Sequence, residues 1–373
     1  MAWKYFERLD SQIAEAVDPV VANILRARRA AGLARFGHIE SAERAIQIVR
    51  SLNTDFNATI TGWTLLSEAL CSHFSAKQDE ATDKLKRCHA IAVSYGLTEL
   101  RALVSAWLST IEFIASRPSE ALAWLTQAFD YAEDTHFETL ARATLVAADC
   151  LSWSGRNDIA SRYYHQARDY ALRDNDLGMQ SIILFNSAAF SVFALVLQDA
   201  FGQCDPISLR KARLQVESVR NLDSGLGNKA LSSYIPLAEA ELLCIERNWE
   251  KALQQLTQYL DQASIEGQTR LLPRLIAQRT WCLANLGNVA EAKESIAQTI
   301  KAKQLCSDLD DLAIIEQRIH QSLCLIETPK TTDRLSSESA ERCLKEFKLQ
   351  QERVYSLIPS LSHVGLSLLN QPG

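Results

Sequence analysis

The residue types that most often carry out chemistry are present, but they are scattered along the chain. There are seven histidines and nine cysteines, and none of them forms H-E-x-x-H, C-x-x-C or another spacing typical of metal ligands. The sequence also contains no G-x-S-x-G, Walker A or G-x-G-x-x-G string, the glycine-rich turns that position a nucleophile or a phosphate. We therefore expect no catalytic residue, no metal site and no cofactor.

Two short stretches come closest to a reactive or phosphate-binding site. Cys150 follows Asp149, and a nucleophilic cysteine is one interpretation of this pair. We expect instead a buried, inert thiol, because a reactive thiolate needs an accessible and electropositive environment. The stretch 224–228 holds Gly225 and Gly227 with no preceding strand, so we interpret it as a link between helices.

The composition limits the fold and the class of partner. The 373 residues include only 13 glycines and 8 prolines, too few for the many turns of a β-sandwich or barrel. Hydrophobic residues make up 47% of the chain, enough to bury a core along its whole length. The net charge of −6 disfavours binding to duplex nucleic acid or to an anionic membrane.

The distribution of charges and cysteines indicates a compartment. The stretch from Leu177 to Gln198 is uncharged and long enough for a membrane span, but its polar residues and the lack of cationic flanks favour a buried core helix. The first ten residues carry four charges and resemble no secretory signal. Single, scattered cysteines are typical of a reducing compartment, so we expect a cytoplasmic protein with no membrane partner.

One basic cluster lies near the N-terminus. It consists of Arg26, Arg28, Arg29 and Arg35, extended by Arg44 and Arg50. We interpret it as a solvated helix face, with a docking patch for an acidic partner as the alternative. An RNA surface is disfavoured, because no aromatic residue interleaves with these arginines between positions 24 and 35.

An internal repeat organises the chain and must position any functional side chains. An alanine follows a small or polar turn and a charged residue in each unit, at Ala42, Ala81, Ala121, Ala160, Ala212, Ala252, Ala292 and Ala340. Successive alanines are 39, 40, 39, 52, 40, 40 and 48 residues apart. A bulky apolar residue stands four positions after each of them, at Ile46, Leu85, Leu125, Tyr164, Val216, Leu256, Ile296 and Leu344. Such a period predicts a stack of helix pairs.

A second regularity predicts where the two helices of a pair cross. Twelve residues before the alanine, the six units without an insertion carry a small residue, at Ala30, Ala69, Ser109, Ala148, Ala240 and Thr280. Two helices approach closely only where side chains are short, so these positions should face the alanines. Five residues before the alanine, Gly37, Gly155 and Gly287 mark the reversal of the chain. Asp18-Pro19 and Asp205-Pro206 are typical helix starts.

These features resemble the tetratricopeptide repeat (TPR) over residues 18 to 330. The shared pattern is a small residue, an alanine twelve positions later, an apolar residue at +4 and a small residue at +7, such as Ala128 and Ala167. The period of about 40 residues is longer than the standard 34, and the closing proline is absent. The chain is most similar to long variants in bacterial signalling proteins, such as sensor regions of maltose-regulon-type activators and of GGDEF diguanylate cyclases.

The resemblance implies an all-α fold, a right-handed α-solenoid of about eight TPR-like helix pairs with a C-terminal capping helix. We expect the solenoid over residues 1–330 and the capping helix with a frayed tail over 331–373. The fifth unit has 12 extra residues, which we attribute to a longer apolar helix from Ser181 to Leu197. We expect a loop at 328–333 and a charged terminal helix at 337–357.

The resemblance also implies a binding face, because TPR arrays bind partners on the concave wall formed by the first helices. Transferred by offset from each alanine, this face comprises Trp63, Leu66, His73, Phe74, Phe113, Arg142, Asp149, Trp153, Tyr234, Glu241, Arg274, Trp281 and Asn285. Tryptophan, tyrosine and arginine are the residues that most often anchor interfaces. The alternative is that the longer helices turn this face inward and make many of these residues part of the core.

The resulting expectation is a non-enzymatic scaffold that binds a protein or peptide partner in its concave groove. One alternative is a regulatory or sensor region that acts on a signalling partner, of the transcription-activator or diguanylate-cyclase type, through the terminal helix. A third is a helical-repeat hydrolase or lyase that uses His73 and Asp149. The identity of the partner and the oligomeric state are left open by the sequence.

Overall fold

A computed structural model describes residues 3–53, 55–202, 204–231, 234–265, 272–304, 306, 308–327 and 331–358. These residues form α-helices and no β-strand. In chain order the helices are α1 (Trp3–Glu15), α2 (Pro19–Arg35), α3 (Ile39–Leu52), α4 (Ala58–Phe74), α5 (Gln78–Ser94), α6 (Thr98–Ile114), α7 (Pro118–Tyr131), α8 (Phe137–Trp153), α9 (Asn157–Arg173), α10 (Leu177–Phe201), α11 (Pro206–Leu226), α12 (Tyr234–Ile245), α13 (Trp249–Ile265), α14 (Leu272–Asn285), α15 (Val289–Lys303), α16 (Leu309–Ile326) and α17 (Thr331–Leu357). The all-α fold class is as predicted.

The chain divides into two compact units. Among the described residues, the first unit contains positions 3–187, 221–231 and 354–358, and the second contains 188–220 and 234–353. Each unit has hydrophobic clusters of its own. The boundary expected at residue 330 stays a prediction.

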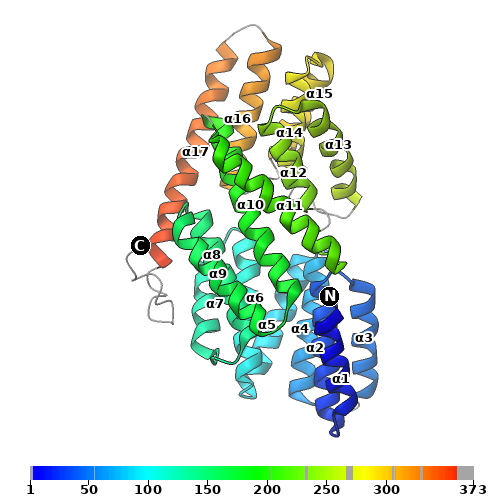
Figure 1. The fold of residues 1–373 in the computed structure, drawn as a ribbon. Coiled ribbons are helices and arrows are strands. Elements are labelled where there is room, and N and C mark those ends of the chain that lie inside the picture. The colour runs from blue at the N-terminus through cyan, green and yellow to red at the C-terminus, as the bar shows by residue number, and fades with distance from the viewer. Residues whose placement is uncertain are drawn as a thin grey trace. The chain divides into compact units, whose positions relative to one another are not determined.

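In the first unit, consecutive helices pack as antiparallel pairs. Helix α2 contacts α3, α4 contacts α5, α6 contacts α7 and α8 contacts α9, and each pair is joined by a short turn (Figure 1). The first helix of each pair also contacts the first helix of the next, in the order α2, α4, α6, α8. Side chains from neighbouring helices of this series therefore contact one another, and the candidate site is formed by such side chains.

In the second unit, the same kind of pairing recurs. Helix α12 contacts α13, and α14 contacts α13, α15 and α16. Buried apolar side chains such as Leu237, Leu256 and Leu275 fill the space between α12, α13 and α14. The cysteines Cys244 and Cys282 are part of this core, with their sulfur atoms 3.4 Å apart.

The small residues twelve positions before each repeat alanine, and the alanines themselves, are buried between helices. All twelve residues of the six units without an insertion have 0% of their surface exposed. In the third unit the contact is direct, because the Ser109 Oγ donates a hydrogen bond of 2.7 Å to the Ala121 carbonyl oxygen. The apolar residues at +4 are buried as well, except Leu344, which is half-buried.

The turn inside each of these six pairs has one recurring geometry. The residue five positions before the alanine has a positive φ in every case: Gly37, Ala76, Ser116, Gly155, Arg247 and Gly287. The next N–H then donates to the carbonyl five residues back, as from His38 to Leu33, which completes a Schellman cap. Glycine is favoured at position 37 for two reasons: its φ is positive, and a Cβ there would lie 2.7 Å from the Ala230 nitrogen. Three of the six left-handed positions are therefore filled by residues other than glycine.

Helix ends agree with some predictions and correct others. The carboxylates of Asp18 and Asp205 accept hydrogen bonds from the first turns of α2 and α11, as predicted. Residues 331–333, predicted as loop, belong to α17, because threonine and aspartate are also common in the first turn of a helix. The remaining residues of that predicted loop and the tail from 359 lie outside the described residues.

Helix α10 is longer than the predicted stretch Ser181 to Leu197. It is the one helix, among the described residues, that is long and apolar enough to cross a membrane by length and composition. None of its apolar side chains is fully exposed, and it contains the buried Asp199. A buried carboxylate within the last turn of the helix favours a core role over a lipid environment.

Candidate functional site

The residues expected to form the binding wall of the first unit are for the most part packed between helices. Trp63, Leu66, Arg142 and Asp149 are buried, while the rest are half-buried. The half-buried ones are His73, Phe74, Phe113 and Trp153. The longer helices thus turn much of this face inward, which the sequence analysis weighed as the alternative.

One group of these side chains meets in a compact cluster, here called the Arg142 cluster: His73 and Phe74 on α4, Trp107 on α6 and Arg142 on α8. The His73 ring contacts Phe74 edge-on at 4.8 Å and Trp107 at 6.0 Å between centroids. The Arg142 guanidinium carbon lies 3.7 Å from the centroid of the Trp107 ring. Three consecutive first helices therefore contribute one cation and three rings to one place. Trp107 was not among the predicted residues, because its offset from Ala121 differs from that of the other aromatics.

The Arg142 guanidinium has no ion pair among the described residues. The side chain is 4% exposed, and its Nη2 atom is buried without a hydrogen-bond acceptor. Burial, with a smaller contribution from the charge of Arg35, lowers the pKa of Arg142 to about 9, against the more distant attraction of the Glu138, Asp176 and Asp149 carboxylates. A desolvated cation without a direct carboxylate contact is costly, so this arrangement needs an explanation beyond packing.

Asp149, two turns after Arg142 on α8, is held by neutral donors. The Tyr164 hydroxyl donates to its Oδ1 at 2.8 Å, and the Asn186 amide donates to its Oδ2 at 2.7 Å. Burial raises the pKa of Asp149 to about 7, against the opposing effect of these hydrogen bonds. Both oxygens thus accept a hydrogen bond from within the chain.

His73 is the third titratable group of this region. Its Nδ1 atom lies 3.0 Å from the Gln78 side-chain oxygen. Burial lowers the pKa of His73 to about 4, so the imidazole is neutral near pH 7. A neutral ring fits its place between Phe74 and Trp107, where a second cation close to Arg142 would be repelled.

The arginines of the predicted basic cluster do not form one surface. Arg28 pairs with Glu99 and stacks on Trp63, with its guanidinium carbon 4.2 Å from the ring centroid. The other partners are Asn23 for Arg26, Asp10 for Arg29, Asp176 for Arg35, Ser41 for Arg44 and Glu68 for Arg50. These side chains belong to separate local networks, which disfavours a single basic docking patch.

In the second unit, the predicted charged residues Arg274 and Glu241 form an ion pair with each other. Arg274 lies 2.6 Å from the Glu241 carboxylate and 3.1 Å from that of Asp311. Burial raises the pKa of Glu241, and the positive charge of Arg274 opposes this effect. Unlike Arg142, Arg274 is therefore already neutralised within the chain.

The remaining predicted residues of the second unit do not converge with this pair. Trp281 packs edge-on against Trp249 at 5.8 Å, and its buried indole N–H has no acceptor. Asn285 donates to the Trp281 carbonyl one turn earlier at 2.8 Å. Tyr234, at the start of α12, is 38% exposed, the only exposed member of the predicted set.

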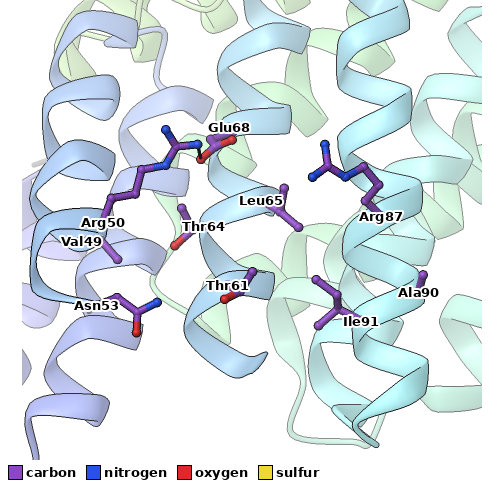
Figure 2. Close-up of a pocket in the computed structure, with 10 residues that line it drawn as sticks. All are labelled: Val49, Arg50, Asn53, Thr61, Thr64, Leu65, Glu68, Arg87, Ala90 and Ile91. Atoms are coloured by element: carbon purple, nitrogen blue, oxygen red, sulfur yellow. Dashed lines mark ion pairs between the residues drawn. The ribbon is translucent and has the colours of Figure 1, made fainter. Parts of the chain in front are cut away.

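The sequence analysis missed a groove on the opposite face of α4. A pocket of about 490 Å³ lies between α3, α4 and α5, and Figure 2 shows the ten residues that line it. From α4 it takes Thr61, Thr64, Leu65 and Glu68, which share one helix face by their spacing. Trp63 and His73 face the other way. The mixture of threonine, arginine and glutamate in this sequence resembles an ordinary solvated face, so no sequence signal marked it.

Among the described residues, no group of three or more histidine, cysteine or acidic side chains could hold a metal ion. No protein-family model matches the chain, and no curated protein matches it either. The function is therefore argued from the geometry.

Proposed function

We propose that this chain is a non-enzymatic, TPR-like scaffold that binds a protein or peptide partner at the Arg142 cluster. The repeated helix crossings and left-handed turns support a right-handed α-solenoid of about eight helix pairs. In such an array the first helices of successive pairs form the wall available to a partner. The Arg142 cluster is contributed by three such helices.

The unpaired guanidinium of Arg142 is the observation that carries this proposal. Every other buried arginine that the structure describes has a carboxylate partner, Asp176 for Arg35 and Asp199 for Arg318. A carboxylate of the partner, either an acidic side chain or a chain terminus, would supply what Arg142 lacks. Arginine suits this role because its planar fork can bind both oxygens of a carboxylate.

The aromatic side chains around Arg142 would supply the rest of the affinity. Phe74 and His73 are half-buried whereas Arg142 is 4% exposed, so a partner would first meet these two residues. Rings of this kind contribute apolar contact area with little loss of side-chain entropy on binding. The expected partner segment is thus acidic with an adjacent apolar residue.

The enzyme alternative has one observation in its favour. His73, Arg142 and Asp149 all have strongly shifted pKa values, which is common at catalytic sites. However, burial causes each shift, and the oxygens of Asp149 are occupied by Tyr164 and Asn186. His73 likewise bonds to Gln78. These contacts favour a structural role for both groups.

The test is affinity capture with the immobilised full-length chain, followed by identification of the recovered proteins. We expect a protein that wild type retains, that Arg142→Met loses, and that the exposed control Arg168→Met retains. Trp153→Ala and Trp281→Ala report whether predicted residues of the first unit and of the second unit, each by itself, contribute to binding. Recovery that is equal for wild type and Arg142→Met, or no protein above background, overturns the proposal.

A capping role for the terminal helix accompanies this proposal. Helix α17 is rich in charged residues, and the end of a helical array needs a polar outer face. Truncation after Lys330 should lower the solubility and the melting temperature of the chain. A truncated protein that keeps both overturns the capping role.

A further inference from the structure

The groove on the outer side of α4 is longer than the pocket in Figure 2. A second pocket of about 560 Å³ continues it toward the start of α5, and the two pockets share Arg50 and Glu68. Together they follow α4 from Thr61 to Ser75. At 1.5 Å per residue this is about 21 Å, the length of a helix of about 14 residues.

The first half of the groove combines an apolar floor with two cations. Val49 of α3 and Leu65 of α4 are buried and form its floor, and Ile91 of α5 is half-buried. Arg50 and Arg87 stand on opposite walls, as Figure 2 shows, and Glu68 is the single carboxylate that lines this half. The second half adds Lys77 and Lys84 and the carboxylates of Glu43 and Glu80, so cations exceed carboxylates by one along the groove, although the chain as a whole is acidic.

The ion pairs of these arginines leave them available to a partner. Arg87 lies 3.7 Å from Asp83 one turn earlier, and both side chains are more than 60% exposed. A pair of this kind is worth only about 0.3–0.5 kcal/mol. Arg50 lies 2.6 Å from Glu68 and is itself 56% exposed, so a second carboxylate can approach it from solvent.

An exposed aromatic pair adjoins in sequence the residues Thr61 and Ile91, which line the first half of the groove. The rings of Phe56, before α4, and Tyr95, after α5, are 5.8 Å apart between centroids. Both are largely exposed, at 68% and 57%. Aromatic side chains at the rim of an apolar groove are typical of protein interfaces.

We propose that this groove binds an amphipathic helix of another protein, with acidic residues beside its apolar stripe. Three helices already line the groove, and its length fits about four turns of a fourth. The apolar stripe would lie against Ile91 above the buried floor of Val49 and Leu65, and the acidic residues would pair with Arg50 and Arg87. This surface lies on the face of α4 opposite the Arg142 cluster, so the inference is independent of the function proposed above.

The test uses a displayed library of peptides of about 14 residues, with leucine at a helical i, i+3, i+4, i+7 spacing and Glu, Lys, Gln or Ala elsewhere. After selection on the full chain, fluorescence anisotropy measures the affinity of the enriched peptides. We expect acid-rich peptides whose affinity falls at least tenfold for Arg87→Glu and for Arg50→Glu. The matched control Arg168→Glu, on the exposed face of α9, should stay within twofold of wild type.

The variant Arg50→Glu places a second carboxylate beside Glu68, so circular dichroism must show that it folds. Arg87→Glu places its carboxylate near Asp83, but both side chains are more than 60% exposed, so the repulsion is screened by solvent and this variant decides the result. No enrichment, enrichment of lysine-rich peptides, or equal affinity for wild type and Arg87→Glu overturns the proposal. Wild-type dimerisation in sedimentation velocity that Arg87→Glu abolishes also overturns it, because the occupant is then a second copy of the chain.

Discussion

The Arg142 guanidinium lies over the Trp107 ring at 3.7 Å, yet it forms no ion pair with a carboxylate of the described residues. A desolvated cation gains about 2 kcal/mol from such a ring, which is less than the cost of removing the charge from water. Within the described chain, this contact therefore offsets only part of the cost of burying Arg142. A partner that supplies an acceptor for Arg142 would offset the rest of this cost and gain affinity from it.

Replacing Arg142 should therefore stabilise the fold while removing the proposed function. In Arg142→Met, an apolar side chain of similar length takes the place of the unpaired cation beside Trp107. We expect the free energy of unfolding to rise by about 1–3 kcal/mol, measured by urea denaturation.

The matched control for this prediction is Arg274→Met in the second unit. Arg274 is paired with Glu241 and Asp311, so its removal leaves buried carboxylates without a counter-charge. We expect a loss of about 3–5 kcal/mol. Equal destabilisation by Arg142→Met and Arg274→Met would contradict the distinction between the two sites.

Asp149 should give the stability of the chain a specific pH dependence. Its pKa is raised from 3.8 to about 7 in the folded state, chiefly by burial. The stability it contributes is thus fully present below about pH 4 and is lost as the pH rises through 7. Each unit of this shift corresponds to about 1.4 kcal/mol.

The difference in stability between wild type and Asp149→Asn isolates this effect. His73, with its pKa lowered to about 4, destabilises both proteins as the pH falls below about 6.5. We expect the wild-type free energy of unfolding, relative to the variant, to fall between pH 4 and pH 7. A constant difference over this range would show that Asp149 is not buried as described.

The left-handed turn positions predict two substitutions to glycine with different outcomes. Ala76 has a φ value of 59°, which costs a residue with a Cβ about 1 kcal/mol. We expect Ala76→Gly to raise the melting temperature by a few degrees. Arg247→Gly should not, because Arg247 lies 2.6 Å from the Asp199 carboxylate and loses this ion pair. A gain from both would show that the ion pair contributes nothing.

The helix crossings should reject larger side chains. Ala148 of α8 and Ala160 of α9 have none of their surface exposed, and these two helices pack against each other. Ala148→Leu should cost about 1–3 kcal/mol or more, because the helices must separate. Ala290→Leu, on the exposed surface of α15, is the matched control and should stay within about 0.5 kcal/mol of wild type. Similar values for the two variants would contradict the assigned crossing.

The sequence predicted the elements of this fold better than the surfaces they form. Ala148 and Ala160 could be recognised because a crossing needs short side chains at a fixed separation. Gly37 marked its turn for a similar reason. Ala76 and Arg247 did not mark their turns in the sequence, because residues other than glycine can adopt the same left-handed conformation at a cost of about 1 kcal/mol. Their conformation is imposed by the packing of the helices on either side.

The site could be predicted only in part. The offset from each alanine placed His73 and Arg142 on one face, and the structure brings them together. The offset did not reveal that His73 and Arg142 are largely buried, because burial depends on how far neighbouring helices extend. The groove was missed because α3 and α5, which carry Arg50 and Arg87, form it only together with α4. The residue spacing along the sequence does not show how far apart α3 and α5 lie in the fold.

The most direct measurement is a double-mutant cycle between Arg142 and the carboxylates of the captured partner. A peptide from the partner is compared with its amidated form, with Asn and Gln in place of its acidic residues, against wild type and Arg142→Met. We predict that amidation weakens binding to wild type at least tenfold and leaves binding to Arg142→Met unchanged. An equal loss for both proteins would contradict the claim that Arg142 is left unpaired for a partner.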